Sequence, residues 1–188
     1  MPRRRFAASL LVLSSSVLLP AAASLPPQNP FAARPKPEHA LLKRLAGKWT
    51  ASFEMTMPGV PPMKSRASEV NEMLGELWIV SRYDDPGMMG GAFAGAQIFG
   101  YDPDEKQYVG AWADSQSSNL SVQKGKYEEA TKTLTLTGTS KDPMTGADSS
   151  VRTVVTWDDD DHRSQTMFVP GPGGKEMEMF TIEYERVK

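Results

Sequence analysis

The residues of this chain best placed to do chemistry are Trp112 and Asp114, two positions apart in a segment that alternates like a β-strand. Residues two apart on a strand face the same side, so a carboxylate would lie beside an indole. If that side is an interior, Asp114 could anchor a ligand or act as a general acid or base. In the structural interpretation, Asp114 joins an internal hydrogen-bond network or ends the strand in a turn.

Other catalytic or cofactor chemistry has few residues to support it. His39 and His162 are the only histidines, and neither is placed on a strand with a defensible inward direction. A Ser-His-Asp hydrolase needs a base beside its nucleophile, and haem needs an axial ligand. Paired methionines could suggest Cu(I), but more simply they fill an adaptable apolar cavity. These methionines are Met55, Met57, Met177 and Met179. We therefore expect no catalytic residue, no metal and no cofactor, and we keep haem or copper as alternatives.

The elements that would position these side chains are one short helix followed by about ten strand-like runs. Leu41, Leu42 and Leu45 fall on one helical face, and Gly47 ends the helix. The strand-like runs cover residues 49–57, 63–74, 77–83, 93–101, 108–114, 120–122, 133–137, 151–157, 167–169 and 180–184. Regular short strands separated by turns predict an all-β, up-and-down antiparallel barrel of about ten strands with one short N-terminal helix. In the polar run 63–74 either alternating face could point inward.

Several motifs together resemble a known bacterial family. They are the entry Leu45-Ala46-Gly47-Lys48-Trp49, the spaced Gly100-Tyr101-Asp102, Tyr108 and Trp112-Ala113-Asp114-Ser115, the turn Asp142-Pro143, and the ending Tyr184-x-Arg186. Over residues 39–186 the chain is similar to the family called domain of unknown function 1579. The resemblance implies a secreted, calycin-like barrel related in shape to lipocalins, and it brings no established activity or ligand. The chain lacks the Thr-Asp-Tyr motif and the disulfide cysteines of true lipocalins.

The same resemblance implies a structural role for Trp49. In lipocalin-like barrels, the Gly-x-Trp tryptophan closes one end of the barrel beneath a basic residue of the last strand. Arg186 is in the position to be that residue. We expect the first and last strands to pair and to bring Trp49 and Arg186 together.

The beginning of the chain predicts export. Residues 1–23 combine three arginines, an apolar stretch and small residues typical of a cleaved signal peptide, with Sec and twin-arginine export both open. Residues 24–36 form a Pro-rich linker, and residues 37–188 form the barrel domain. The chain has no cysteine, so no lipoprotein anchor is expected, and its net charge is −2. We expect a periplasmic or extracellular protein that binds no nucleic acid and has no membrane span after cleavage.

We expect a binding protein for a small, largely apolar or amphipathic molecule inside the barrel, and not an enzyme. The predicted ligand-binding residues are Phe53, Met55, Ile79, Arg82, Gln97, Phe99, Tyr108, Trp112 and Asp114. One alternative is a structural or envelope-interaction module with a packed interior. Another is an enzyme working inside the barrel with Asp114 as the acid or base. The sequence leaves open the ligand, the oligomeric state and whether the interior is open or packed.

Overall fold

The computed structural model describes residues 29, 32–56, 61–142 and 145–188, and residues 34–188 form one compact unit. The predicted signal peptide, residues 1–23, lies outside the described residues, as do much of the predicted linker and Met57.

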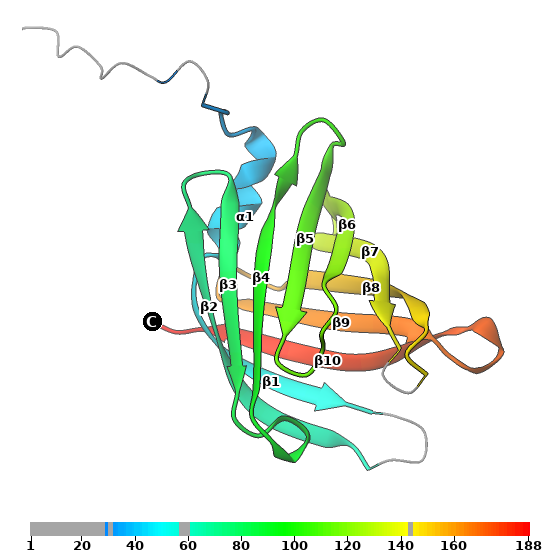
Figure 1. Cartoon of the computed structure of the whole chain (residues 1–188). Coiled ribbons are helices and arrows are strands. Elements are labelled where there is room, and N and C mark those ends of the chain that lie inside the picture. Colours follow the sequence, from blue (N-terminus) through cyan, green and yellow to red (C-terminus); the bar gives the residue numbers. More distant parts are fainter. Residues whose placement is uncertain (1–28, 30–31, 57–60, 143–144) are drawn as a thin grey trace, which may run out of the picture. The chain divides into compact units, whose positions relative to one another are not determined.

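The compact unit is a closed, ten-stranded antiparallel barrel (Figure 1). Its strands are β1 (Gly47–Met55), β2 (Met63–Leu74), β3 (Trp78–Asp85), β4 (Phe93–Asp102), β5 (Gln107–Asp114), β6 (Ser121–Glu128), β7 (Thr133–Lys141), β8 (Asp148–Trp157), β9 (His162–Pro170) and β10 (Glu176–Arg186). Each strand pairs with its neighbours in sequence, and β1 pairs with β10 to close the barrel. The structure therefore confirms the predicted fold class.

Alternation along each strand separates an inner from an outer face. In β1, Trp49, Ala51, Phe53 and Met55 are buried, and the residues between them are more exposed. The structure also settles the polar strand β2, in which the odd-numbered residues face inward, because Glu69 and Asn71 are buried. The carboxylate of Glu69 and the amide of Asn71 therefore belong to the interior, although the sequence did not determine which face of this strand points inward.

A short helical segment packs against the barrel at the end where β1 begins. A 3₁₀ turn, η1 (Pro37–His39), leads into α1 (Ala40–Leu45), which buries Leu41 and Leu42. A helix this short depends on such packing, because isolated helices of this length are unstable in water. None of the helices in the described residues is long and apolar enough to cross a membrane.

Inward-facing glycines allow the sheet to coil tightly. A Cβ on Gly125 would lie 1.8 Å from the Thr135 carbonyl oxygen, and one on Gly138 would lie 2.2 Å from that of Val122. Glycine within a strand often marks such a bend or a close approach of backbones. At Gly95 the space of a side chain is filled by the Trp112 ring, which places that indole over β4.

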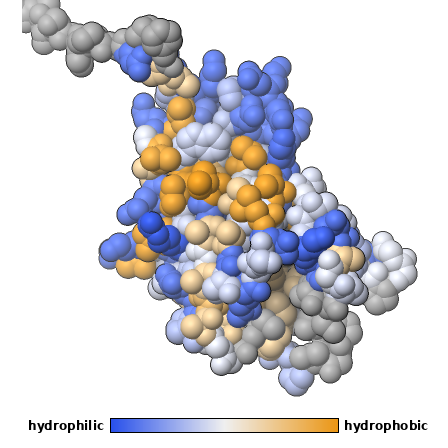
Figure 2. Space-filling model, in the orientation of Figure 1, coloured by the Kyte–Doolittle hydropathy of each residue, from blue (hydrophilic) through white to orange (hydrophobic). Residues whose placement is uncertain are grey.

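The outer face of β3 to β6 carries apolar side chains in a continuous row. Val80, Ile98, Ala111 and Val122 are successive cross-strand partners, and Ile98 is 51% exposed. Figure 2 shows apolar side chains gathered over these strands.

Candidate functional site

The end of the barrel that contacts the helix is closed by Trp49 and Arg186. The two residues are cross-strand partners, and the guanidinium of Arg186 lies 4.1 Å from the centre of the indole ring. Arg186 also donates hydrogen bonds to the carbonyl oxygens of Arg44 and Ala46, while the Trp49 indole N–H donates to that of Leu45 at 2.9 Å. The contact expected between Trp49 and Arg186 is therefore present, and it also holds the end of the helix.

A buried ion pair beneath this closure was not predicted from the sequence. Arg163 is 2% exposed and donates to the carboxylate of Glu69, which also accepts from the Asn71 amide at 2.6 Å. The guanidinium lies 3.6 Å from the centre of the Tyr184 ring and 4.8 Å from that of Trp49. The only sequence signal was alternation, which places these charged positions on the inner faces of β2 and β9.

The predicted apolar contacts divide between two buried clusters. Ile79, Phe99 and Tyr108 pack in the cluster that includes the helix residues, with the Phe99 and Tyr108 rings stacked at 5.7 Å. Phe53 and Met55 belong to the second cluster, in which the rings of Phe53 and Phe180 lie 5.4 Å apart. All five predicted apolar side chains therefore lie in the interior, and their contact with a ligand stays a prediction.

Several polar groups in the barrel interior have no partner within the described residues. The hydroxyls of Tyr83 and Thr153 and the side-chain oxygen of Gln123 are buried without a hydrogen bond. Tyr83 is 3% exposed and Thr153 is 4% exposed. Burial, together with nearby Asp85 and Glu69, raises the pKa of Tyr83, so its hydroxyl stays protonated and remains a donor. An unpaired buried polar group costs about 1–3 kcal/mol, so such groups are rare in native cores.

Two further amides face inward and remain partly accessible. Gln97 lies between the exposed Ala96 and Ile98, and a Cβ on Gly110 would lie 3.0 Å from its amide nitrogen. Gln165 pairs with the buried residues Ile182 and Val155, yet its own side chain is only half-buried. Neither amide makes a hydrogen bond to another described residue. Both amides are therefore partly accessible and available to a hydrogen-bonding partner.

Trp112 and Asp114 face the same side, as their spacing predicts, at the far end of β5. The Trp112 indole N–H donates to one oxygen of Asp114 at 3.1 Å, and the backbone N–H of Gln116 donates to the other at 2.9 Å. Phe93 stacks on Trp112 with the ring centres 6.4 Å apart. Asp114 therefore orients an indole and ends the strand in a turn. This is the structural interpretation, and nothing in the geometry favours a general acid or base.

Arg82 does not lie in the interior, which corrects the prediction that it contributes to a lumenal site. Its neighbours Ser81 and Tyr83 are buried, so the alternation of β3 points Arg82 outward. Its side chain is 66% exposed and lies 3.6 Å from Glu72 on the outer face.

The acidic run 158–161 forms the turn between β8 and β9 and pairs with basic residues of two other elements. Arg44 pairs with Asp160 at 3.2 Å, and Arg186 pairs with Asp161 at the same distance. Ion pairs therefore connect the turn to both the helix and the last strand. Because these pairs are partly exposed, each contributes little alone.

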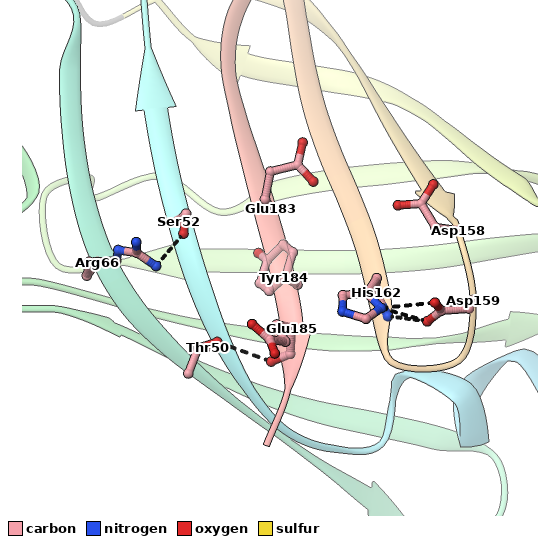
Figure 3. A pocket seen from close by; sticks show the side chains of 9 residues that line it. All are labelled: Thr50, Ser52, Arg66, Asp158, Asp159, His162, Glu183, Tyr184 and Glu185. Carbon is pink, nitrogen blue, oxygen red and sulfur yellow. Dashed lines mark hydrogen bonds and ion pairs between the residues drawn. The ribbon is translucent and has the colours of Figure 1, made fainter. Parts of the chain in front are cut away.

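An outer pocket of about 400 Å³ lies beside this turn (Figure 3). Its polar side chains are largely satisfied by one another. Arg66 donates to Ser52 at 2.9 Å, and His162 pairs with Asp159 at 2.9 Å. The hydrogen bond to Asp159 raises the pKa of His162, whereas burial and nearby Asp158 raise the pKa of Glu183. No group of carboxylates and histidines in the described chain could hold a metal ion. The pocket is a solvated part of the surface.

A second groove, of about 780 Å³, lies between the helix and strands β4 to β6. Its floor is formed by tyrosines whose polar ends are already bound. Tyr108 donates to the carbonyl oxygen of Glu38 at 2.8 Å, and Arg44 donates to the hydroxyl of Tyr127 at 3.1 Å. His39 does not line this groove and is buried in the helical segment, with its Nδ1 atom 2.9 Å from the backbone nitrogen of Lys36. The His39 ring also lies 5.7 Å from that of Tyr101, edge to face.

The closed antiparallel barrel, its Gly-x-Trp entry and its capping helix define a protein of the calycin-like class. The profile of the family described as "Protein of unknown function (DUF1579)" matches residues 34–186, so the chain belongs to that family. No curated protein was found to be significantly similar in sequence.

Two solved structures share the barrel at low sequence identity. Rv2717c from M. tuberculosis is similar with a TM-score of 0.62 and 12% identity, over 81% of this chain and 99% of that one. The S-type phycobiliprotein lyase CPES from Guillardia theta is similar with a TM-score of 0.56 and 10% identity, over 80% and 93%. These likenesses establish the fold alone.

Proposed function

We propose that this protein binds a small, largely apolar molecule inside its barrel. The observation that carries the proposal is the set of inward-facing polar groups that have no hydrogen-bond partner within the described residues. Their side chains belong to Tyr83, Gln97, Gln123, Thr153 and Gln165. A ligand with its own hydrogen-bonding groups would satisfy them and would also cover apolar surface, which is how most small-molecule sites work.

The distribution of these groups around the barrel supports an enclosed site over a surface site. They come from five different strands, namely β3, β4, β6, β8 and β9. The surrounding aromatic and methionine side chains supply adaptable apolar contacts. A phycobiliprotein lyase is built on a similar barrel, so the fold is compatible with such a role, although the chemistry of that lyase is not transferred.

The test is a titration with N-phenyl-1-naphthylamine, an uncharged dye that fluoresces in apolar sites. We expect saturable binding of one dye per chain. The variant Ala67→Phe fills the interior, because Ala67 faces inward on β2 and is half-buried, and it should weaken binding at least tenfold. The matched control Ala113→Phe adds the same ring to an exposed outer position of β5 and should leave binding unchanged.

Two results would count against the binding proposal. The first is no saturable dye fluorescence with the wild-type protein, which would favour a packed structural module. The second is equal loss of binding in both variants, which would place the dye outside the barrel. If Ala67→Phe does not fold, Gln165→Phe adds bulk to the interior from β9 and takes its place.

Export is a second part of the proposal, and it depends on the sequence of residues 1–23. We expect the protein recovered from its source to begin at Ser24, outside the cytoplasm. Intact-mass measurement of the natural protein tests this directly. A chain that retains Met1 to Ala23 would exclude cleavage at this position.

A further inference from the structure

We propose that the interior selects an uncharged ligand and rejects carboxylates and other anions. This inference rests on the proposed function and specifies the ligand's chemical class. It follows from which charged groups face the interior and from what each of them already binds.

Five charged residues face inward on the described strands. They are Glu69, Asp85, Asp114, Arg163 and Arg186. Three are acidic and two are basic, so the formal charge of the inner face is negative. An anion that leaves water to enter such a space loses its hydration, and a large part of that cost remains unless a cation meets it.

Both arginines of the inner face already have hydrogen-bond partners within the protein. Arg163 is paired with Glu69 and packed against two aromatic rings, although its Nε atom has no hydrogen-bond partner within the described residues. Arg186 donates to the carbonyl oxygens of Arg44, Ala46 and Asp160, and so belongs to the closed end. Neither arginine is without an acidic or carbonyl partner, so a carboxylate, sulfonate or phosphate would have to compete with Glu69 for Arg163 or with backbone carbonyl oxygens for Arg186.

The two remaining carboxylates are also satisfied, so they do not form a ready site for a cation. Asp85 is 1% exposed and accepts hydrogen bonds from the hydroxyl of Ser65 and from the backbone N–H of Gly87. Asp114 accepts from Trp112 and Gln116, as described above. Apart from Arg163 Nε and the indole Nε1 of Trp157, the inward groups without a partner in the described chain are amides and hydroxyls. These can pair with uncharged carbonyl, hydroxyl or amide groups, which enter the interior without the desolvation cost of a charge.

A matched pair of dyes measures this selectivity. N-phenyl-1-naphthylamine is uncharged, and 8-anilino-1-naphthalenesulfonate carries the same two aromatic groups with one negative charge. We expect the uncharged dye to bind at least tenfold more tightly. Displacement of the bound dye by decanamide should then need at least tenfold less ligand than displacement by decanoate or decylamine.

A gain-of-function variant tests the reason for the selectivity. Gln97→Arg places a cation on the inner face of β4, and it should improve decanoate binding at least tenfold relative to decanamide. The control Thr139→Arg adds the same charge to an exposed position of β7, where it should change neither affinity. If Gln97→Arg does not fold, Gln165→Arg tests the same point from β9.

The outcomes separate this inference from the binding proposal itself. If neither dye binds, the proposed function fails and the inference fails with it. If the anionic dye or decanoate binds as tightly as its uncharged counterpart, the barrel is a binding protein and only the selectivity is wrong. Tightest binding by decylamine would also overturn the inference, because it would show that the inner carboxylates determine the ligand.

Discussion

At the scale of single residues, two arginines hold the closed end of the barrel by different means. Arg186 donates to carbonyl oxygens at the end of the helix and stacks on Trp49. The resemblance to lipocalin-like barrels predicted the contact with Trp49 but not the hydrogen bonds to the helix. Arg163 is buried against Glu69, yet it follows the acidic turn and gave no motif to recognise. Alternation could have corrected Arg82, because Ile79 and Tyr83 already define the opposite face of its strand.

Replacing Arg163 by Met tests the buried ion pair. Removal of one partner leaves the Glu69 carboxylate buried without a cation, so we expect the free energy of unfolding to fall by about 3–5 kcal/mol. Urea unfolding followed by circular dichroism measures this. The control Arg82→Met breaks an exposed pair and should cost less than about 1 kcal/mol. Equal effects of the two variants would contradict the assignment of Arg163.

The Trp112 and Asp114 pair also belongs to this scale. Their shared direction was predictable from a spacing of two. A turn at Asp114 was one of the structural alternatives, but its partner Gln116 was not predicted, because it depends on where the strand ends. We expect Asp114→Asn to leave dye binding within about twofold, since the amide oxygen can still accept one of the two hydrogen bonds and the account gives Asp114 no contact with the ligand. A loss of affinity for the dye of tenfold or more would contradict this and would indicate that Asp114 anchors the ligand.

At the scale of elements, the passage from helix to first strand depends on Gly47. Its φ angle is +124°, and a Cβ there would lie 2.7 Å from a guanidinium nitrogen of Arg186. A side chain at this position would therefore be strained and would push Arg186 from the helix carbonyls. The sequence predicted a helix stop at Gly47, and the structure adds that the same glycine allows the closing contact.

Substitution of Gly47 by Ala tests this joint function. We expect a loss of about 1–3 kcal/mol from backbone strain, with a further loss from displacement of Arg186. Gly75→Ala is the matched control, because Gly75 has φ +63° but nothing within 4 Å of an added Cβ, and it should cost about 1–2 kcal/mol. Thermal and urea unfolding of both variants provide the comparison. A smaller loss at Gly47 than at Gly75 would show that the close approach to Arg186 does not matter.

The strands were the most predictable elements, because most of them alternate clearly between apolar and polar residues. The exception was β2, where inward Ser65, Glu69 and Asn71 are as polar as the residues that face solvent. A strand that is polar on both faces carries no information about its direction. Only the pairing with β1 and β3 determines which side of β2 is buried.

At the scale of the whole molecule, buried tyrosines link the stability of the barrel to pH. Burial raises the pKa of Tyr83, Tyr108 and Tyr184, and for Tyr184 the neighbouring Glu69 raises it further. In the unfolded chain these hydroxyls ionise near pH 10. The folded state thus gains stability that is complete below that pH and is lost as the pH rises toward the folded-state values.

We therefore expect alkaline unfolding accompanied by a late step of tyrosine ionisation. Tyrosinate absorbance should rise only partly near pH 10, and the remainder should appear together with the loss of the far-ultraviolet circular dichroism signal. Full ionisation of all five tyrosines near pH 10 in a still-folded protein would contradict the burial described here.

The central claim is that unpartnered groups inside the barrel receive a small molecule. Nuclear magnetic resonance of the glutamine side-chain amides tests it most directly, during titration with N-phenyl-1-naphthylamine. The account predicts saturable shifts for the amides of Gln97, Gln123 and Gln165 and no shift for Gln116, which is exposed after β5. Unchanged inner amides at saturating dye, or shifts confined to the outer face, would contradict it.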